Sequence, residues 1–203
     1  MTLSAEDRAR RIKILLFDVD GVLTDGQLYF LPKDGGQPGP DGKPHGLEFK
    51  GFTAHDGLGI NIARLGGLRV GLITKRESAT VAIRASDLRL EFVYQGQSHK
   101  MTAVNDILQR TGCTLDQLAF VGDDVIDLPV MRVCGLAIAT ANARHQTKIA
   151  AHYITPNPGG QGAGRDAIEF ILAAQDKLDY AIEALLDADN PAAHDTFIGS
   201  GNM

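Results

Sequence analysis

The chain has 203 residues, of which 44% are hydrophobic and 22% charged, values that are ordinary for a globular protein with a sizeable core. Its formal net charge of -5 argues against a general nucleic-acid-binding protein, because neutralising phosphates requires clustered Lys and Arg. Two cysteines are too few for a disulfide framework, and no apolar run approaches the roughly 20 residues of a membrane span. The charged N-terminus lacks the apolar core of a signal peptide. We therefore expect a cytoplasmic protein with no membrane partner.

Short apolar segments alternate with helical segments along the chain. In chain order, we predict a strand at 14–19, a hairpin of two short strands at 27–30 and 47–52, a helix within 57–67, a strand at 68–74, a helix at 77–88, a strand at 90–96 and a helix at 100–112. We then predict a strand at 118–122, a helix at 127–135, a strand at 136–140, a helix at 144–151, a strand at 152–155 and one long helix from Arg165 to about Leu186. This alternation predicts an α/β fold with a doubly wound parallel sheet. We expect one domain over residues 1–186 with the hairpin 27–52 as an insertion, followed by a disordered tail over 187–203.

Polar side chains follow three of the predicted strands. Asp18 and Asp20 end the first, Thr74 ends the second, and Asp123 with Asp124 follows the strand at 118–122. In parallel sheets, ligands bind at the carboxyl ends of the strands. We therefore expect these side chains to share one site.

The pair Asp18 and Asp20 requires a physical explanation, because two neighbouring carboxylates repel each other. A hard cation such as Mg²⁺ removes the conflict, and Mg²⁺ in turn points to a phosphate-bearing substrate. A carboxylate can also attack phosphorus and form an aspartyl-phosphate. The alternative for "DVDG" alone is a turn after a strand, but it does not account for the other two strand ends.

The segments "FDVDGVLTDG", "LIT", Lys100 and "VGDDVIDLPVM" resemble the four ordered motifs of the haloacid dehalogenase superfamily of phosphotransferases. The resemblance implies that Asp18 is the nucleophile and a metal ligand, and that Asp20 is the general acid/base and binds the metal through its backbone carbonyl. Thr74 is implied to hydrogen-bond the transferred phosphoryl group. The remaining implied roles are charge neutralisation for Lys100, metal binding for Asp123 and support of these groups for Asp127 and Asp124.

A narrower resemblance covers about residues 11–178 and is carried by "DGVLTDG", "EFKGFTAHDGLGI", "VYQGQSHK", "GDDVIDLPVM" and "GGQGAGRD". These segments are similar to the capless family of 3-deoxy-D-manno-octulosonate 8-phosphate phosphatases. The resemblance implies a homotetramer in which a glycine-rich C-terminal segment closes a neighbouring active site. It also implies the following substrate-binding residues: Thr53, Ala54, His55, Asp56, Gly57, Arg76, Arg84 and Arg165.

Departures from the family pattern leave alternatives open. Lys75 stands where family members commonly have glycine, and the hairpin tip is longer than usual. The chain could therefore act on a nine-carbon 2-keto-3-deoxy sugar acid phosphate or resemble the small subunit of phenylphosphate carboxylase. A non-enzymatic alternative is an oligomerisation scaffold, similar to the appended domain of some sialic-acid cytidylyltransferases. A scaffold has no need to keep Asp18, Asp20, Thr74, Lys100 and Asp123 together.

Overall fold

The central sheet of the molecule has six parallel strands. The computed structural model describes residues 3–37, 46–187 and 189–190, and the strand order of its main sheet is β5-β4-β1-β6-β7-β8. The strands are β1 (Ile14–Phe17), β4 (Arg69–Ile73), β5 (Phe92–Tyr94), β6 (Leu118–Gly122), β7 (Leu136–Ala139) and β8 (Tyr153–Ile154). β1 lies between β4 and β6 and pairs in parallel with both. The predicted parallel sheet is confirmed.

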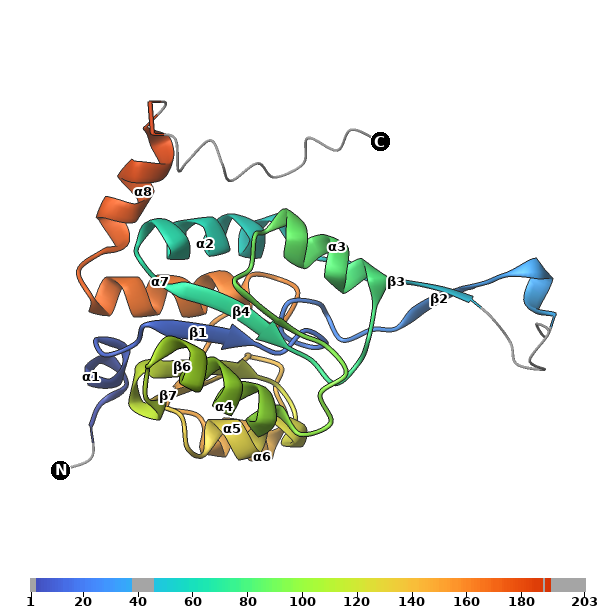
Figure 1. Ribbon diagram of the computed structural model, residues 1–203, viewed down its shortest axis with the longest axis horizontal. Helices are drawn as coiled ribbons and strands as arrows, with labels where there is room; N and C mark the ends of the chain where they lie inside the picture. The colour runs from blue at the N-terminus through green and yellow to red at the C-terminus, as the bar shows by residue number, and fades with distance from the viewer. Residues whose placement is uncertain (1–2, 38–45, 188, 191–203) are drawn as a thin grey trace.

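Helices cover both faces of this sheet (Figure 1). The first face is covered by α1 (Ala5–Ala9), α2 (Ala54–Leu65), α3 (Ala79–Asp87), α7 (Ala163–Ala174) and α8 (Leu178–Leu186), and the second by α4 (Lys100–Thr111), α5 (Leu128–Met131) and α6 (His145–Ala150). Leu15 and Phe17 of β1 pack on the first face, whereas Ile14 and Leu16 pack on the second. This two-sided burial explains why the strand is a continuous apolar run. Within the described residues, no helix combines the length and apolar character needed to span a bilayer.

A tight turn after β1 brings the first acidic residues to the carboxyl edge of the sheet. β1 ends at Phe17, before the predicted end at Val19, and three backbone N–H groups donate to the Val19 carbonyl oxygen at 3.0–3.2 Å: Val22, Leu23 and Thr24. Gly21 adopts φ +86°, and a Cβ atom there would overlap the Asp123 carboxylate. The turn therefore requires glycine, both for its conformation and for the close approach of Asp123.

The hairpin projects from the body of the molecule (Figure 1). Its strands are β2 (Tyr29–Pro32) and β3 (Gly46–Phe49), which pair antiparallel. β2 begins two residues later than predicted, because the backbone N–H of Gln27 donates to Asp25 Oδ1 at 2.9 Å in a local turn. The short 3₁₀ turn Asp34–Gly36 follows β2, and residues 38–45 of the predicted tip lie outside the described part of the chain.

No separate covering domain lies between the motif-bearing strands in the described residues. The interval from β1 to β4 holds the hairpin and α2, and the interval from β4 to β6 holds α3, β5, α4 and the 3₁₀ turn Leu115–Gln117. The carboxyl edge of the sheet is therefore not capped by a second domain of the same chain within these residues, in agreement with the capless architecture expected from the resemblance.

The prediction of one long C-terminal helix from Arg165 to Leu186 is wrong. The chain forms two helices, α7 and α8, which are separated at Asp176 by a left-handed backbone conformation (φ +56°). The Gln175 side chain donates to the carbonyl oxygens of Ala9 and Ile12 at 3.0 and 2.8 Å and holds this bend against the N-terminal segment. Most of the tail predicted as disordered, residue 188 and residues 191–203, lies outside the described residues.

Candidate active site

A cavity of about 450 Å³ opens at the carboxyl edge of the sheet. It is lined by Asp18, Asp20, Gly26, Thr74, Lys75, Arg76, Asp123, Asp124 and Ile126. These residues follow β1, β4 and β6, the three adjacent central strands. The structure therefore brings together the strand-end side chains that the sequence predicted to share a site, and it adds Gly26, Lys75 and Ile126 to the cavity wall.

Asp18 is almost fully buried at the base of the cavity, with 4% of its surface exposed. Its Oδ1 accepts a hydrogen bond from the Val19 N–H at 2.7 Å, and its Oδ2 lies 2.8 Å from Lys100 Nζ. Burial and the neighbouring charge of Asp127 raise the pKa of Asp18 to about 6, although Lys100 opposes this shift. The carboxylate is thus fixed in one orientation and is only weakly stabilised as an anion by the protein alone.

Lys100 and Asp127 support Asp18 from within the protein. Lys100 is the first residue of α4, and its Nζ lies 2.6 Å from Asp127 Oδ1. The other oxygen of Asp127 accepts from the backbone N–H groups of Asp123 and Asp124 at 2.9 and 3.4 Å. Asp127 is fully buried and therefore fixes both the lysine and the backbone after β6.

Thr74 and Asp124 line the cavity from the ends of β4 and β6, the two strands that flank β1. Thr74 is buried directly after β4, and its backbone N–H donates to the Tyr94 carbonyl oxygen at 2.9 Å, which fixes its position against β5. Asp124 is exposed, and its Oδ1 accepts from the Val125 N–H at 2.7 Å in the cap of a 3₁₀ turn (Val125–Asp127). Thr74 can present its hydroxyl to a ligand, whereas Asp124 shapes the loop that carries Asp123.

Asp18, Asp123 and Asp127 form a group of carboxylates that fits a hard divalent cation. One oxygen from each lies within 4.8 Å of the others. Burial and the charges of Asp127 and Asp18 raise the pKa of Asp123 to about 7, so the group carries uncompensated negative charge. Oxygen ligands and concentrated negative charge are the properties that favour Mg²⁺. Because Asp18 and Asp123 line the cavity whereas Asp127 is fully buried away from it, Asp18 and Asp123 are the members best placed to bind the cation.

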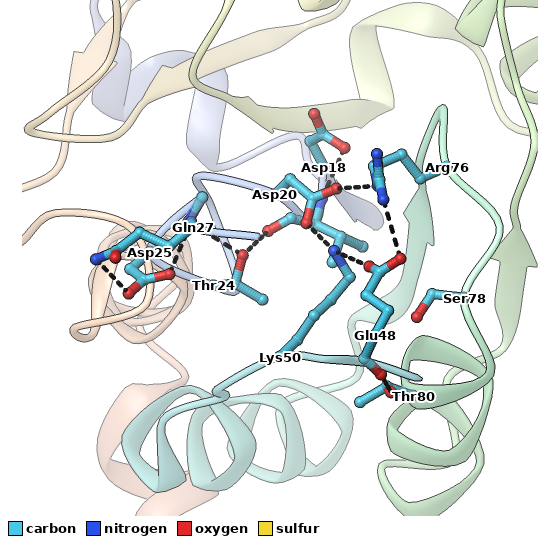
Figure 2. Close-up of polar contacts among 12 residues, drawn as sticks. Asp18, Asp20, Thr24, Asp25, Gln27, Glu48, Lys50, Arg76, Ser78 and Thr80 are labelled. Carbon is cyan, nitrogen blue, oxygen red and sulfur yellow. Dashed lines mark hydrogen bonds and ion pairs between the residues drawn. The ribbon is translucent and has the colours of Figure 1, made fainter. Parts of the chain in front are cut away.

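The Asp20 carboxylate is not in this acidic group and pairs with two cations instead (Figure 2). Its Oδ1 accepts from Lys50 Nζ, and its Oδ2 lies 3.8 Å from Arg76 Nε. Lys50 and Arg76 also both pair with Glu48, at 2.8 and 2.9 Å. Glu48 and Lys50 are not among the site residues predicted from the sequence. The available signal was the alternation in "LEFK", which places Glu48 of β3 and Lys50 directly after it on one side, and Leu47 with Phe49 on the other.

Of the predicted substrate-binding residues, only Arg76 lines the cavity. Thr53, Asp56, Gly57 and Arg84 surround a smaller crevice with Leu23, Phe52, Ile60 and Leu88. Ala54 and His55 are exposed in the first turn of α2. The structure thus places one residue of the predicted set at the cavity and the others away from its lining, and a substrate-binding role for the others remains a prediction.

Asp56 and Arg165 connect α2 to α7. The buried Asp56 carboxylate accepts from the Arg165 backbone N–H at 2.8 Å, and its pKa is raised to about 6, chiefly by burial. The Arg165 side chain pairs with Glu169 one helical turn later. Asp56 therefore binds the first turn of α7, whose N-cap Gly162 has no side chain to cap it.

The glycine-rich segment 159–164 packs against the loop after β1 of its own chain, and its contact with a neighbouring site remains a prediction. The Gly160 N–H donates to the Val22 carbonyl oxygen at 3.0 Å, and the Gly159 N–H donates to Asn142 Oδ1 at 2.9 Å. A Cβ atom at Gly159 would overlap the Gly21 carbonyl, so glycine is required for this close packing. In the structure, the segment supports the loop that carries Asp20.

Comparisons with known proteins agree with this site. A family model for haloacid dehalogenase-like hydrolases matches residues 72–163. The 3-deoxy-D-manno-octulosonate 8-phosphate phosphatase KdsC of Yersinia pestis is 40% identical over 174 residues, which cover 86% of this chain and 87% of the relative. The crystal structure of the 3-deoxy-D-manno-octulosonate 8-phosphate phosphatase from Yersinia pestis has a TM-score of 0.77 at 39% identity and covers 86% of this chain and 88% of that one.

A second solved structure is similar in both fold and sequence. The 3-deoxy-D-manno-octulosonate 8-phosphate phosphatase from Moraxella catarrhalis, in complex with a magnesium ion, a phosphate ion and KDO, has a TM-score of 0.79 and is 36% identical, covering 88% of this chain and 96% of that one. These similarities extend over most of this chain and of each relative rather than over one motif. The chain therefore belongs to the haloacid dehalogenase-like hydrolases, within the family of the 3-deoxy-D-manno-octulosonate 8-phosphate phosphatases.

Proposed function

We propose that this chain is a Mg²⁺-dependent phosphatase that hydrolyses 3-deoxy-D-manno-octulosonate 8-phosphate to the free sugar acid and phosphate. The observation that carries the proposal is the convergence of Asp18, Thr74 and Asp123 from three adjacent strand ends on one cavity. The relatives named above support the choice of substrate, since their names specify this sugar-acid phosphate.

In the first chemical step, Asp18 attacks the phosphorus atom. A bond forms between an Asp18 carboxylate oxygen and phosphorus while the bond from phosphorus to the sugar oxygen breaks, which leaves an aspartyl-phosphate. Asp20 gives its proton to the departing sugar oxygen. Lys100, which lies 2.8 Å from Asp18, and the hydroxyl of Thr74 stabilise the charge on the phosphoryl oxygens.

In the second step, water attacks the aspartyl-phosphate. Asp20, now a carboxylate, accepts a proton from the water as its oxygen bonds to phosphorus, and the bond from phosphorus to Asp18 breaks. Phosphate is released, Asp18 is regenerated as a carboxylate, and Asp20 again holds the proton for the next cycle. Both proton transfers therefore involve the same side chain at the cavity wall.

Asp18 and Asp123, with the backbone carbonyl of Asp20, would hold Mg²⁺ in this scheme. When bound, Mg²⁺ supplies positive charge for the phosphoryl oxygens and relieves the repulsion among the carboxylates. The raised pKa values of Asp18 and Asp123 support this assignment, because burial and the neighbouring carboxylates disfavour their charged forms, and a bound cation would offset both effects. Asp127 and Asp124 are proposed to hold the loop and Lys100 in place.

The sugar acid is proposed to contact the cations at the cavity wall. Arg76 has a planar guanidinium that can pair bidentately with a carboxylate, and Lys75 is exposed beside it. The proposed substrate roles of the other residues rest on the family resemblance: Thr53, Ala54, His55, Asp56, Gly57, Arg84 and Arg165.

We also propose a homotetramer assembled through the hairpin. Six large apolar side chains of this segment are exposed: Leu28, Tyr29, Phe30, Leu31, Leu47 and Phe49. Exposed apolar patches of this kind mark interaction surfaces, and the rings of Tyr29 and Phe49 already stack at 5.3 Å. Residues 1–186 are proposed as one phosphatase domain with the hairpin as its insertion. A cytoplasmic location is supported by the free Cys113 and Cys134.

A panel of phosphate esters tests the proposed function. We expect Mg²⁺-dependent phosphate release, with kcat/KM for the octulosonate 8-phosphate far above that for a nine-carbon sugar-acid phosphate, phenyl phosphate or p-nitrophenyl phosphate. A preference for the nine-carbon acid or for phenyl phosphate would keep the chemistry and overturn the substrate. No release from any ester by the folded, Mg²⁺-loaded protein would favour the scaffold alternative.

A further inference from the structure

Four charged side chains form a closed ring beside the cavity (Figure 2). Lys50 Nζ contacts Asp20 Oδ1 and lies 2.8 Å from Glu48 Oε1, while Arg76 Nη2 lies 2.9 Å from Glu48 Oε2 and Arg76 Nε lies 3.8 Å from Asp20 Oδ2. In both Asp20 and Glu48, one carboxylate oxygen thus faces Lys50 and the other faces Arg76. We refer to Asp20, Glu48, Lys50 and Arg76 as the charge ring; it joins the loop after β1 to the hairpin and to the segment after β4.

Lys50 is the buried member of the charge ring. Only 1% of its side-chain surface is exposed, compared with 39% for Arg76. A buried ammonium group is costly unless opposite charges and hydrogen bonds compensate it. Asp20 and Glu48 compensate the Lys50 ammonium. These two carboxylates therefore fix the position of the ammonium, and the ammonium fixes the positions of the carboxylates.

The two oxygens of Asp20 are held differently. Oδ1 accepts a hydrogen bond from Lys50, whereas Oδ2 accepts none among the described residues, and its ion pair with Arg76 spans 3.8 Å. Arg76 and Asp20 both line the cavity, while Lys50 does not. One oxygen is therefore anchored from the hairpin side, and the other remains available for a proton on the cavity side.

We propose that Lys50 is a positioning residue that orients Asp20 for both proton transfers of the reaction, and that Glu48 fixes the positions of Lys50 and Arg76. This inference rests on the proposed function, in which Asp20 is the general acid and base. Without Lys50, the Asp20 carboxylate can rotate about its side-chain bonds and also faces the like charge of Glu48. A displacement of about 1 Å in a catalytic group can cost roughly 10²-fold in rate.

Glu48 is suited to this supporting role. Its pKa is lowered: burial alone would raise it, but hydrogen bonds from Lys50 and Arg76 outweigh that effect. Glu48 therefore stays charged and neutralises one of the two cations next to Asp20. The Thr80 hydroxyl donates to the Glu48 carbonyl oxygen at 3.2 Å, which ties this part of β3 to α3.

The test compares Lys50→Met with Lys33→Met, an exposed lysine of the same hairpin. With the sugar-acid phosphate and Mg²⁺, Lys50→Met should lower kcat by about 10²-fold and leave KM within about twofold, because proton transfer rather than binding is impaired. Lys33→Met should match the wild-type chain. Circular dichroism and a Mg²⁺ titration verify that each variant is folded and binds the metal.

A pre-steady-state measurement with p-nitrophenyl phosphate separates positioning from a structural role. Nitrophenolate leaves without a proton, so Lys50→Met should form the aspartyl-phosphate at about the wild-type rate and then hydrolyse it slowly. The expected signature is a burst of about one nitrophenolate per subunit followed by a steady phase slowed by about 10²-fold. If both phases fall together, Lys50 is merely structural, and if KM alone rises, Lys50 binds substrate; either result overturns the proposal.

If Lys50→Met does not fold, Glu48→Gln provides the same readout, because it keeps the Lys50 contact to Asp20 but removes the charge that holds Lys50. The burst should persist with a smaller decrease in the steady phase, and its absence in the folded variant would overturn the proposal. Failure of the proposed substrate would appear in the wild-type chain, as hydrolysis of the aryl ester but not of the sugar-acid phosphate. The burst comparison would still decide the role of Lys50.

Discussion

Lys100 Nζ and Asp127 Oδ1 lie 2.6 Å apart in a fully buried ion pair, directly behind the carboxylate proposed as the nucleophile. The same lysine lies 2.8 Å from Asp18, and the second oxygen of Asp127 accepts the backbone N–H of Asp123. One buried carboxylate therefore connects α4, the end of β6 and the two proposed metal-binding aspartates. Loss of its charge should affect both stability and catalysis.

Asp127→Asn should lower the free energy of unfolding by about 3 kcal/mol, because it leaves a buried ammonium with one fewer counter-charge. Urea denaturation measures this change. The matched control is Asp124→Asn, in which an exposed carboxylate caps a short turn and the expected loss is below about 1 kcal/mol. Equal losses in the two variants would contradict the structural role assigned to Asp127.

Asp18→Asn should abolish phosphate release, by at least about 10⁴-fold, because a carboxamide cannot form the aspartyl-phosphate. The variant should remain folded by circular dichroism. Asp25→Asn is the control, since Asp25 belongs to the same loop but does not line the cavity, and it should retain activity. Hydrolysis by folded Asp18→Asn at a rate near that of the wild-type chain would exclude Asp18 as the nucleophile.

The stability of the metal-free chain should fall as the pH rises from about 4 to about 7. The pKa of Asp18 and Asp56 in the folded protein is about 6, and that of Asp123 is about 7, compared with 3.8 for an ordinary Asp. In this window the folded state binds protons that the unfolded state releases, so folding is favoured at the acid end and loses that contribution as each folded-state pKa is passed. Thermal unfolding at pH 5 and pH 8 measures the difference.

Mg²⁺ should raise the melting temperature more at pH 8 than at pH 5, because protons compete with the cation for Asp18 and Asp123. The part of the pH-dependent loss of stability that is due to Asp56 should persist with Mg²⁺, since Asp56 is not part of the acidic group. In Asp123→Asn the effect of Mg²⁺ should be largely lost. An equal increase at both pH values would argue against binding of the cation by these carboxylates.

Lys75 should contribute to recognition of an anionic substrate. Its side chain is exposed at the cavity wall next to Thr74. Lys75→Met should raise KM for the sugar-acid phosphate by about two- to fivefold, the scale of an exposed ion pair, and leave kcat unchanged. The same variant should leave KM for p-nitrophenyl phosphate nearly unaltered, because that ester lacks the second negative group. Lys75→Gly shows whether the bulk of the side chain matters in addition to its charge.

Phe30→Glu in the hairpin should produce a smaller oligomer, since it places a charge in the proposed interface between copies of the chain. Light scattering coupled to size exclusion gives the mass. Ile149→Glu on α6 is the control: Ile149 is equally apolar and also exposed, but it lies far from the hairpin, on the second face of the sheet. An unchanged mass for Phe30→Glu would contradict assembly through the hairpin.

The sequence predicted the sheet and the carboxyl-edge site because both depend on local patterns. The strand 118–122 was predicted with the bounds it has in the structure, since a short apolar run bounded by turn residues is typical of a strand buried on both faces. Asp18, Thr74 and Asp123 were predicted together because each directly follows such a strand. Parallel topology then places all three at one edge.

The features that the sequence did not reveal depend on contacts between distant segments. The apolar period runs through Gln175 and Asp176, and only the hydrogen bonds from Gln175 to the N-terminal segment show why the helix ends there. Glu48 on a short strand and Lys50 directly after it are ordinary charges in the sequence, and only the turn after β1 places Asp20 beside Lys50. Spacing along the chain carries no information about such pairs.

The position of β1 between β4 and β6 has a consequence for how the enzyme is synthesised. Asp18 is among the first site residues to leave the ribosome, whereas Lys100, Asp123 and Asp127 follow only after β4 and β5 have been made. Until β6 inserts beside β1, the nascent chain has neither the lysine–aspartate support nor the second metal-binding carboxylate. Phosphatase activity should therefore appear in one step late in translation, once β6 has completed the site.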